Sequence, residues 1–581
     1  MARLTQYDYI FAIGTIFAFL DAWNIGANDV ANSWATSVAS RSVTYIQAMV
    51  LAGLMEFTGA VGAGSRVTDT IRTKIVDPDL FAEDPAVLML GMLCAVIASA
   101  CFLTFATKIG FPVSTTHSIL GGVLGMGIAA VGADDITWVS KDDDGKVQVK
   151  SGVVAVFLAW IIAPCISAGF ASIIFLITKF GVLLRSNPIM KAFFTIPFYF
   201  GVTAALLCML IITKGGQIKS GLNGPETAGV IVGTGAAWAL LICIFLMPWI
   251  HRRVIKDDWQ LRWYHIPMGP LLLRRGEVPP PPEGQDTQIK NYYEGHLTRE
   301  ELEARRAGAV ARGDVEAGVV DAEGKYATKE STNSASSDTD VYDRVPERKS
   351  IVGPKPEGGF SGALVFWYLK YAIFRGIDKD VVNMQNEKGV LSGDLEDTHA
   401  RASHFDNKVE YMFAFLQVMT AATASFTHGA NDVANAIGPY ASIFQIWNQG
   451  ALPDKPGVPT WILAFGGVAI MIGLWTYGYH IMKNLGNRLT LQSPSRGFSI
   501  ELGSAITIIL ATKLALPIST TQCITGATVG VGLCNGDWRA INWRMVGWIY
   551  LGWIITLPLA GIVSGCLMGF IINAPRFGYS S

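Results

Sequence analysis

Long apolar runs dominate the chain on both sides of a polar middle section, and each is close to the roughly 20 residues that a helix needs to cross a bilayer. They begin near residues 7, 43, 86, 113, 152, 192, 227, 411, 461, 499, 517 and 543. This pattern predicts an all-α polytopic membrane protein with about twelve transmembrane segments, some of them broken or re-entrant. The first run leads directly into a polar motif, so we expect it to be retained as a span and not cleaved as a signal peptide.

Charged residues are concentrated in the polar middle section of the chain. Only 16% of the 581 residues are charged, against about 25% in an average soluble domain. Residues 251–400 hold 21 of the 45 Lys and Arg side chains and 25 of the 46 Asp and Glu side chains. The chain is therefore a membrane protein with one large polar insert. Its formal net charge of −1 gives no reason to expect a nucleic-acid partner.

The basic residues beside the insert predict its side of the membrane. Arg252, Arg253 and Lys256 follow the seventh apolar run, and Lys370 and Arg375 precede the eighth. Lys and Arg gather in cytoplasmic loops, so we expect the insert to be cytoplasmic and both termini to lie outside. The predicted location is the plasma membrane.

The insert itself is predicted to be largely disordered. It contains a run of four prolines at 279–282 and a Ser/Thr/Asp tract at 331–340, which is typical of a linker. Two exceptions stand out. Thr298 and Glu301 have the spacing of a helix-capping box, and residues 362–379 have the composition of a helix that lies on the membrane surface.

Two polar motifs interrupt the apolar runs, and both occur twice. GANDVAN stands at 26–32 and again at 429–435, and each copy is followed by a P-x-S-T-T element, at 112–116 and 517–521. With the predicted topology, the first half enters the membrane from outside and the second from inside. Two similar halves in opposite orientation predict an inverted-repeat transporter with its site near the middle of the membrane.

GANDVAN carries the residues that a membrane interior tolerates least. A carboxylate at the bilayer centre costs about 2.5 to 3.5 kcal/mol on the insertion scale, so Asp29 and Asp432 are expected to face a polar cavity. Glu56 and Glu501 raise the same question in other apolar runs. Gly26 and Gly429 are expected to loosen the helix, which predicts a break at each motif.

The P-x-S-T-T element predicts the start of a helix. Pro112 and Pro517 end one segment, and the hydroxyl residues after them can open the next. A helix N-terminus presents unpaired N–H groups and the positive end of the dipole, which makes it a natural anion site. Ordinary capping of a re-entrant helix is the alternative.

Together the motifs predict a cation-coupled oxyanion symporter. Donor-rich helix ends attract an anion, the neighbouring aspartates repel one, and none of the four motifs contains Arg or Lys. Hard cations such as Na⁺, bound by oxygen atoms, would resolve the conflict, as would protonation of the aspartates. The residues alone do not choose the anion.

At this point the motifs resemble a known family. The two GANDVAN segments and the two P-x-S-T-T elements resemble those of the inorganic phosphate transporter (PiT) family, and the stretch 8–48 together with the long insert looks like its fungal sodium/phosphate symporters. The resemblance covers roughly 5–135 and 408–575. It implies Na⁺-coupled symport of inorganic phosphate into the cell by alternating access.

The resemblance also assigns residues. The implied phosphate-binding residues are Asn28, Ser114, Thr115, Thr116, Asn431, Ser519, Thr520 and Thr521. The implied sodium-binding residues are Asp29, Asn32, Asp432, Asn435, Glu56 and Glu501, with His117 and His428 as accessory residues. His117 has no histidine counterpart, because Gln522 holds the matching place in the second element.

The expected organisation follows from these assignments. Residues 5–135 are predicted to form the first inverted repeat, 150–250 additional transmembrane helices, 251–405 the cytoplasmic loop, and 408–575 the second repeat with a final helix. The expected partners are inorganic phosphate, Na⁺ and the lipid bilayer, without an organic cofactor, and a homodimer is left open.

Three other functions remain open from the sequence. The first is a proton-coupled phosphate permease or a sulfate permease of the same fold, and the second is a transporter with an added phosphate-sensing role carried by the insert. The third is a membrane hydrolase built on Ser114, His117, Asp29 and His428. We do not expect an enzyme, because no nucleophile-elbow motif is present.

Overall fold

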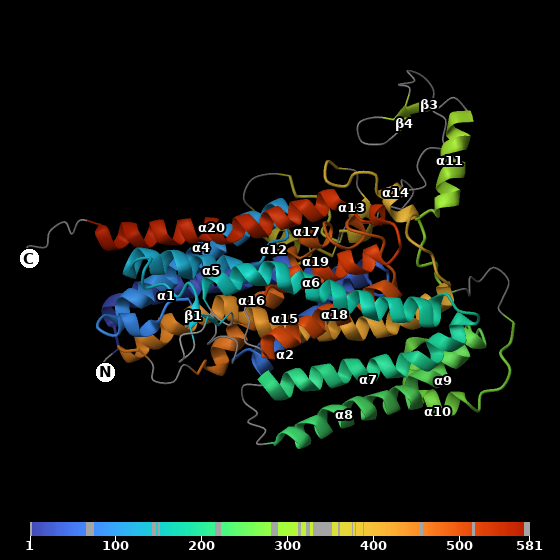
Figure 1. Cartoon of the computed structure of the whole chain (residues 1–581), viewed down its shortest axis with the longest axis horizontal. Coiled ribbons are helices and arrows are strands. Elements are labelled where there is room, and N and C mark those ends of the chain that lie inside the picture. The colour runs from blue at the N-terminus through green and yellow to red at the C-terminus, as the bar shows by residue number, and fades with distance from the viewer. Residues whose placement is uncertain are drawn as a thin grey trace, which may run out of the picture.

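The protein is a bundle of long helices with a smaller group of insert helices at one end (Figure 1). The computed structural model describes residues 3–65, 75–141, 147–148, 152–214, 222–280, 289–311, 315–320, 326–328, 351–357, 361–374, 376–377, 379–386, 389–452, 457–513 and 518–574. Arg3 and the other described residues before α1 lie near the C-terminal end of α15, where the Leu4 N–H donates to the Trp447 carbonyl.

Each of the twelve predicted apolar segments is a helix. Those before the insert are α1 (Asp8–Ala39), α2 (Tyr45–Ala63), α4 (Pro85–Ile109), α5 (Thr115–Val131), α6 (Val153–Thr178), α7 (Pro188–Lys214) and α8 (Gly224–Leu241). Those after it are α15 (Asn407–Gln449), α16 (Thr460–Tyr477), α18 (Pro494–Lys513), α19 (Thr520–Leu533) and α20 (Trp543–Asn573). The protein is thus all-helical in its membrane part.

Eight of the described helices are long and apolar enough to cross a membrane: α1, α2, α4, α6, α7, α8 with its extension to Ile255, α16 and α20. The apolar helix α5 is shorter. The remaining three, α15, α18 and α19, carry the polar residues of the second half. Large side chains on the outer helices are open to the surroundings, among them Phe194 (72% exposed) and Val232 (68%). Such a surface suits contact with lipid.

The two motif helices lie side by side and run antiparallel. At one end the Trp447 indole on α15 donates to Asp8 on α1, and at the other the Ser40 hydroxyl after α1 donates to Gln417 on α15. Around this pair, α4 and α16 pack on α1, and α2 and α18 pack on α15. The helices α5 and α19 pack against α20 and α6 respectively. This arrangement places both copies of GANDVAN, together with the first turns of α5 and α19, at the centre of the bundle.

The expected break at GANDVAN is wrong. Both copies lie inside uninterrupted α-helices, α1 and α15. The motif glycines serve close packing instead: a Cβ on Gly26 would fall on the backbone oxygen of Ile470 in α16, and one on Gly429 on the backbone oxygen of Glu56 in α2. The chain breaks elsewhere, between α4 and α5, where Gly110 takes a left-handed conformation (φ 75°) before Pro112. Pro517, at the matching place, lies outside the described residues.

The insert has ordered parts that dock on the bundle. Its helices are α10 (Gly269–Leu272), α11 (Arg299–Ala311), α12 (Gly362–Phe374), α13 (Val381–Asn386) and α14 (Leu395–Ala400). Just before the insert, α9 (Met247–Ile250) belongs to the extension of α8, and α17 (Tyr479–Met482) is a short turn after α16. Two antiparallel strand pairs complete the described elements: β1 (Ser140–Lys141) with β2 (Val147–Gln148), and β3 (Val315–Val320) with β4 (Tyr326–Thr328). Figure 1 shows α9, α10, α11 and α14 gathered at one end.

Two sequence expectations for the insert can be followed in the structure. The capping box at the start of α11 is confirmed, because the Glu301 carboxylate accepts from the Thr298 N–H (2.8 Å) and the Glu301 N–H donates to the Thr298 hydroxyl (3.4 Å). Residues Gly362–Phe374 are helical, with Phe366 and Leu369 exposed. The Ser/Thr/Asp tract at 331–340 lies outside the described residues.

Buried polar contacts attach the insert to the helix bundle. Glu410 on α15 is fully buried and accepts from the Tyr293 hydroxyl (2.7 Å) and from the Ser495 N–H (2.8 Å). Arg401 pairs with Asp397 and with Asp537, which precedes α20. Residues on both sides of the predicted linker are therefore part of the folded body.

His399 on α14 makes this attachment sensitive to acid. The ring is 2% exposed and its Nε2–H donates to the Asn487 carbonyl (2.6 Å). Burial lowers the pKa of His399 from 6.5 to about 4. The unfolded state therefore binds more protons between these values, so stability should fall as the pH drops from about 6.5 towards 4.

We expect the apparent melting temperature of the purified protein to fall across this pH window, and His399→Gln to flatten the decline. The measurement is a set of thermal unfolding curves between pH 8 and 4. An equal decline in the variant would show that the acid sensitivity arises elsewhere, for example at His404, whose pKa burial also lowers to about 4.

Candidate functional site

The aspartates of the two GANDVAN motifs meet at the contact between α1 and α15. Asp29 is 1% exposed and Asp432 is 0% exposed. Both side chains face the first turns of α5 and α19, which reach the same point from either side of the helix pair. The prediction that each half of the chain contributes to one central cluster of polar residues thus has a geometric basis.

The two Ser-Thr-Thr triplets begin α5 and α19 in the same way. Ser114 and Ser519 are the N-cap residues, and their hydroxyls accept from the backbone N–H of His117 (3.2 Å) and Gln522 (3.5 Å). Capping leaves the threonines in the first turn, where the N–H groups point out of the helix. All four threonine side chains are at most 4% exposed: Thr115, Thr116, Thr520 and Thr521.

Each aspartate accepts a hydrogen bond from one threonine hydroxyl of each triplet. Asp29 accepts from Thr115 (2.8 Å) and from Thr521 (3.3 Å). Asp432 accepts from Thr520 (3.0 Å) and from Thr116 (3.3 Å). The bonds therefore cross between the two halves of the chain, and movement of one half relative to the other must break or exchange them.

The second asparagine of each motif adds further hydrogen bonds between the two halves of the chain. Asn32 donates to Thr521 (2.9 Å) and Thr520 (3.5 Å), and Asn435 donates to Thr115 (3.1 Å) and Thr116 (3.2 Å). Each amide thus binds the triplet of the opposite half. Asn435 also donates to Asp432 (3.0 Å). The Oδ1 of Asn32 has no hydrogen-bond partner among the described residues, so an acceptor oxygen remains at the site.

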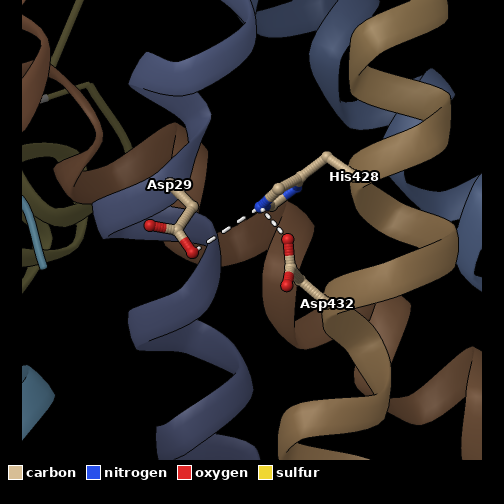
Figure 2. Close-up of side chains that lie close together, drawn as sticks. All are labelled: Asp29, His428 and Asp432. Atoms are coloured by element: carbon tan, nitrogen blue, oxygen red, sulfur yellow. Dashed lines mark ion pairs between the residues drawn. The ribbon is translucent and has the colours of Figure 1, made fainter. Parts of the chain in front are cut away.

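His428 lies beside the two motif aspartates (Figure 2), and Glu56 contacts the other side of its ring. Its Nδ1 lies 2.7 Å from Glu56 Oε2, and its Nε2 lies 3.0 Å from Asp432 Oδ2 and 3.6 Å from Asp29 Oδ2. Nε2 is close to both aspartates but hydrogen-bonded to neither. Asp29, His428 and Asp432 together present ligand atoms within 4.8 Å of one another, which is close enough to hold one metal ion.

Five of the residues assigned from the sequence lie at the margin of this cluster. Asn28 donates to the Phe111 carbonyl and accepts from the Val113 N–H (3.2 Å), so its amide holds the loop before α5. His117 accepts from the Trp160 indole on α6 (2.9 Å). Asn431 is partly exposed and donates to Asp432 (3.2 Å). Ser114 and Ser519 act through the helix caps described above.

Glu501 lies apart from the aspartates, towards the end of α1 that faces the insert. It accepts from Thr36 (2.6 Å), Ser37 (2.8 Å) and Gln417 (3.2 Å), and its other oxygen accepts from Thr420 (2.5 Å). Glu56, by contrast, belongs to the central cluster and accepts from Ser425 (3.0 Å) and His428. The two glutamates thus occupy different environments.

Sequence reasoning missed the hydroxyl residues that hold these glutamates. Thr36 follows Asn32 by four residues on α1, and Ser425 precedes His428 by three on α15. Residues at these spacings share one face of a helix. Extending the motif by one turn in each direction along that face would have identified them.

The chemistry of the cluster favours cations and an oxyanion together. Asp29, Glu56 and Asp432 are three carboxylates, and His428, which is positively charged only when both ring nitrogens carry a proton, is the basic side chain beside them among the described residues. The excess of negative charge can be balanced by small cations bound to oxygen. The N-termini of α5 and α19 supply the N–H groups and hydroxyls that an oxyanion needs.

Comparison with known proteins agrees with this chemistry. The profile of the phosphate transporter family matches residues 25–564. The phosphate-repressible phosphate permease pho-4 of Neurospora crassa is 63% identical over 593 residues, which cover 99% of this chain and 100% of that protein. Sodium-dependent phosphate transporter 2 of Felis catus is 27% identical and covers 97% of this chain and 98% of its own length.

Archaeal and structural relatives extend the comparison. A putative phosphate permease of Thermococcus kodakarensis, TK2061, is 29% identical over 96% of this chain and 97% of its own. A solved structure titled "The sodium-dependent phosphate transporter" shares the fold, with a TM-score of 0.62 at 24% identity over 98% of this chain and 100% of its own. With the family profile matching nearly the whole chain, this protein belongs to the phosphate transporter family.

Proposed function

We propose that this member of the phosphate transporter family is a Na⁺-coupled symporter that moves inorganic phosphate into the cell by alternating access. The observation that carries the proposal is the crossing of hydrogen bonds, in which each aspartate binds one threonine of each triplet. Such a site is assembled by both halves and is sensitive to their relative position, as alternating access requires.

The proposed roles follow from the donors and acceptors. Phosphate binds at the first turns of α5 and α19, where backbone N–H groups and the threonine hydroxyls converge. Na⁺ binds at Asp29 and Asp432, with Asn32 Oδ1 as a further oxygen ligand. The cations screen the aspartates from the anion, so that each solute raises the affinity for the other, as coupling demands.

The antiparallel course of α1 and α15 supports the proposal of two inverted repeats, within about twelve transmembrane segments. Asn32 binds the second triplet and Asn435 binds the first. A two-fold relation between the repeats would produce this pair of equivalent contacts. In the proposed orientation the insert is cytoplasmic, the termini are outside, and the protein resides in the plasma membrane.

The central side chains are closed to both faces of the bundle. Apart from Asn431, the assigned residues of the cluster are at most 5% exposed. A small cleft on the insert side is lined by Thr36, Thr525 and Thr528, which lead from the triplet of α19 towards the cytoplasmic end. We propose that release of solute proceeds along these hydroxyls when α1 and α19 separate.

Uptake of labelled phosphate into liposomes holding the purified protein tests the proposal. A Na⁺ gradient is imposed in one arm and a proton gradient in another, each with and without excess sulfate. Uptake driven by Na⁺ and unaffected by sulfate is the expected result. Uptake driven by protons, or inhibited by sulfate, would assign a different ion or anion to the same site.

Proton coupling is the second candidate, and the position of His428 favours it. A proton on Nε2 would lie between Asp29 and Asp432, where the proposed Na⁺ also lies, so the two positive charges compete. We expect the Na⁺ concentration for half-maximal thermal stabilisation to fall several-fold as the pH rises and the proton leaves Nε2. In His428→Gln the dependence should vanish; its persistence would place the competing proton on another group.

A further inference from the structure

Asp21 is a buried carboxylate that the proposed transport site does not use. It lies on α1, eight residues before Asp29, which corresponds to about 12 Å along the helix. Its side chain is 0% exposed, and neither carboxylate oxygen has a hydrogen-bond partner among the described residues. An ionised carboxylate in the membrane interior without a partner is unfavourable. Either a cation or a proton must therefore neutralise Asp21.

Two neighbouring side chains also present unpaired oxygen atoms. Ser99 on α4 is fully buried and lies close enough to Asp21 for its hydroxyl to interact with the carboxylate, although the two side chains do not form a hydrogen bond of normal geometry. Asn24 lies one turn along α1 from Asp21 and is fully buried as well. Its Oδ1 lacks a donor among the described residues.

The orientation of the Asn24 amide is fixed by its other bonds. Its Nδ2 donates to the carbonyls of Leu20 (2.9 Å) and Ala100 (3.3 Å) and to the Thr104 hydroxyl (2.9 Å). Two of these partners can only accept, so exchanging the amide oxygen and nitrogen would place oxygen against oxygen. The unpaired atom is therefore an acceptor, and it lies on the same α1–α4 contact as Asp21 and Ser99.

We propose that Asp21, Asn24 and Ser99 form a second Na⁺ site, separate from the central cluster. The set offers four oxygen atoms: two from the carboxylate, one from the amide and one from the hydroxyl. A hard monovalent cation accepts all of them as ligands and neutralises the charge. A proton on Asp21 is the competing occupant, because the carboxyl O–H and the Ser99 O–H would supply two donors to the same group of oxygen atoms. Equilibrium binding of labelled Na⁺ distinguishes the cation from the proton.

The site has a polar connection to the centre of the bundle. Asn24 and Asn28 follow Asp21 on one face of α1, and each donates to a threonine of α4: Asn24 to Thr104 and Asn28 to Thr107 (3.1 Å). The next residue on this face, Asn32, binds the triplet of α19. The site lies on the side of Asp29 away from Arg41, which pairs with Glu294 of the insert. A cation there would be the first to bind from the side opposite the insert.

This inference deepens the proposed Na⁺ coupling and rests on it for its role in transport, but the binding itself can be tested separately. The test measures equilibrium binding of labelled Na⁺ to the purified full-length protein, and the Na⁺ dependence of phosphate uptake in liposomes. The variants are Asp21→Asn and Ser99→Ala. Ser564→Ala is the matched control, because Ser564 is a buried serine with an unpaired hydroxyl on another helix, α20.

Asp21→Asn is expected to bind one Na⁺ fewer per protein, and the Hill coefficient for Na⁺ in uptake should fall. Ser99→Ala should keep the number of sites and weaken one of them about fivefold, while Ser564→Ala changes neither. Ser99→Ala keeps the inference testable if Asp21→Asn does not fold.

Unchanged Na⁺ binding in both Asp21→Asn and Ser99→Ala would overturn the inference. So would a variant in which the pH dependence of uptake changes while Na⁺ binding does not, since Asp21 would then hold a proton. Loss of one bound Na⁺ in Asp21→Asn would support the second site even if uptake in the unmodified protein proved to be proton-driven. In that case the proposed coupling fails and the binding site stands.

Discussion

Replacing Asp432 with asparagine is expected to lower Na⁺-driven phosphate uptake at least about 100-fold, while the protein still folds and reaches the membrane. Asp432 accepts from Thr116, Thr520 and Asn435 and lies 3.0 Å from His428 Nε2. Asparagine has nearly the same shape, so the packing of α15 should survive. The change removes one negative charge from the cluster that is proposed to bind Na⁺.

The expected loss has an electrostatic origin. In a buried site the attraction between a carboxylate and a cation is screened far less than in water, so one lost charge is costly. The asparagine Nδ2 would also point a donor at the place of the cation. Asp29→Asn should have the same effect, because Asp29 has the equivalent threonine bonds.

The matched control is Asp8→Asn, the same chemical change on α1. Asp8 accepts from the Trp447 indole (2.8 Å) at the end of the helix, far from the motif. We expect its uptake to be close to that of the unmodified protein. The measurement is initial uptake over a range of Na⁺ concentrations, with the amount of folded protein determined by size-exclusion chromatography.

Normal Na⁺-dependent uptake in Asp432→Asn would remove Asp432 from the cation site. A loss that high Na⁺ fully restores would indicate a weakened site and not an abolished one. If both aspartates belong to one cluster, the double variant should lose little more than either single variant, because residues that act as a unit are not additive.

The sequence predicted the helices of this fold well, and the reason is physical. A span must be apolar over its whole length, so the apolar residues themselves show where each span lies in the sequence. The predicted starts near 43, 86 and 543 correspond to helices that begin at Tyr45, Pro85 and Trp543. The repeated motifs likewise indicated that Asp29 and Asp432 meet, because both were expected at one central site.

What the sequence could not provide is the partner of each polar side chain. Gly26 was expected to break α1, but the reason for a glycine there is the backbone of α16, which is more than 400 residues away in the chain. The hydrogen bonds of the Asn28 amide to the loop at Phe111 and Val113 were likewise not predicted, and its assignment to phosphate stays a prediction. Glu56 and Glu501 received one role, and the structure gives them different neighbours. Tertiary contacts of this kind depend on how helices pack, which no local pattern contains.

The contacts that dock the insert on the bundle could not be predicted from the sequence for a similar reason. Tyr293 and Arg401 lie in the insert, which was predicted to be largely disordered, yet Tyr293 bonds the buried Glu410 and Arg401 pairs with Asp537. A few anchoring side chains suffice to order a polar segment when their partners lie on a rigid bundle. Composition averages over such residues and does not reveal them.

The second large effect is expected at the motif glycines. Gly26→Ala and Gly429→Ala should each prevent normal folding, or lower the apparent melting temperature of the surviving protein by about 10 °C or more. A Cβ at either position would fall on a backbone oxygen, that of Ile470 or that of Glu56. Backbone atoms cannot move aside as a flexible side chain can, so two long helices would have to separate along the contact.

Gly62→Ala on α2 is the matched control, since a Cβ there meets nothing within 4 Å. Alanine in an exposed helix is favoured over glycine by about 0.5 to 1 kcal/mol, so this variant should be as stable as the unmodified protein or slightly more stable. The measurement is thermal unfolding in detergent, together with the yield of monodisperse protein. The comparison separates a packing role of glycine from its general effect on helices.

The same variants decide between the two explanations for glycine in GANDVAN. If Gly26 and Gly429 served to loosen their helices, alanine would stiffen α1 and α15, leave stability unchanged or higher, and affect transport alone. If they serve close packing, both alanine variants should be less stable than the unmodified protein. Gly429→Ala should in addition reduce uptake per folded molecule more than Gly26→Ala does, because its new methyl group would displace the backbone of Glu56 and with it the carboxylate that pairs with His428.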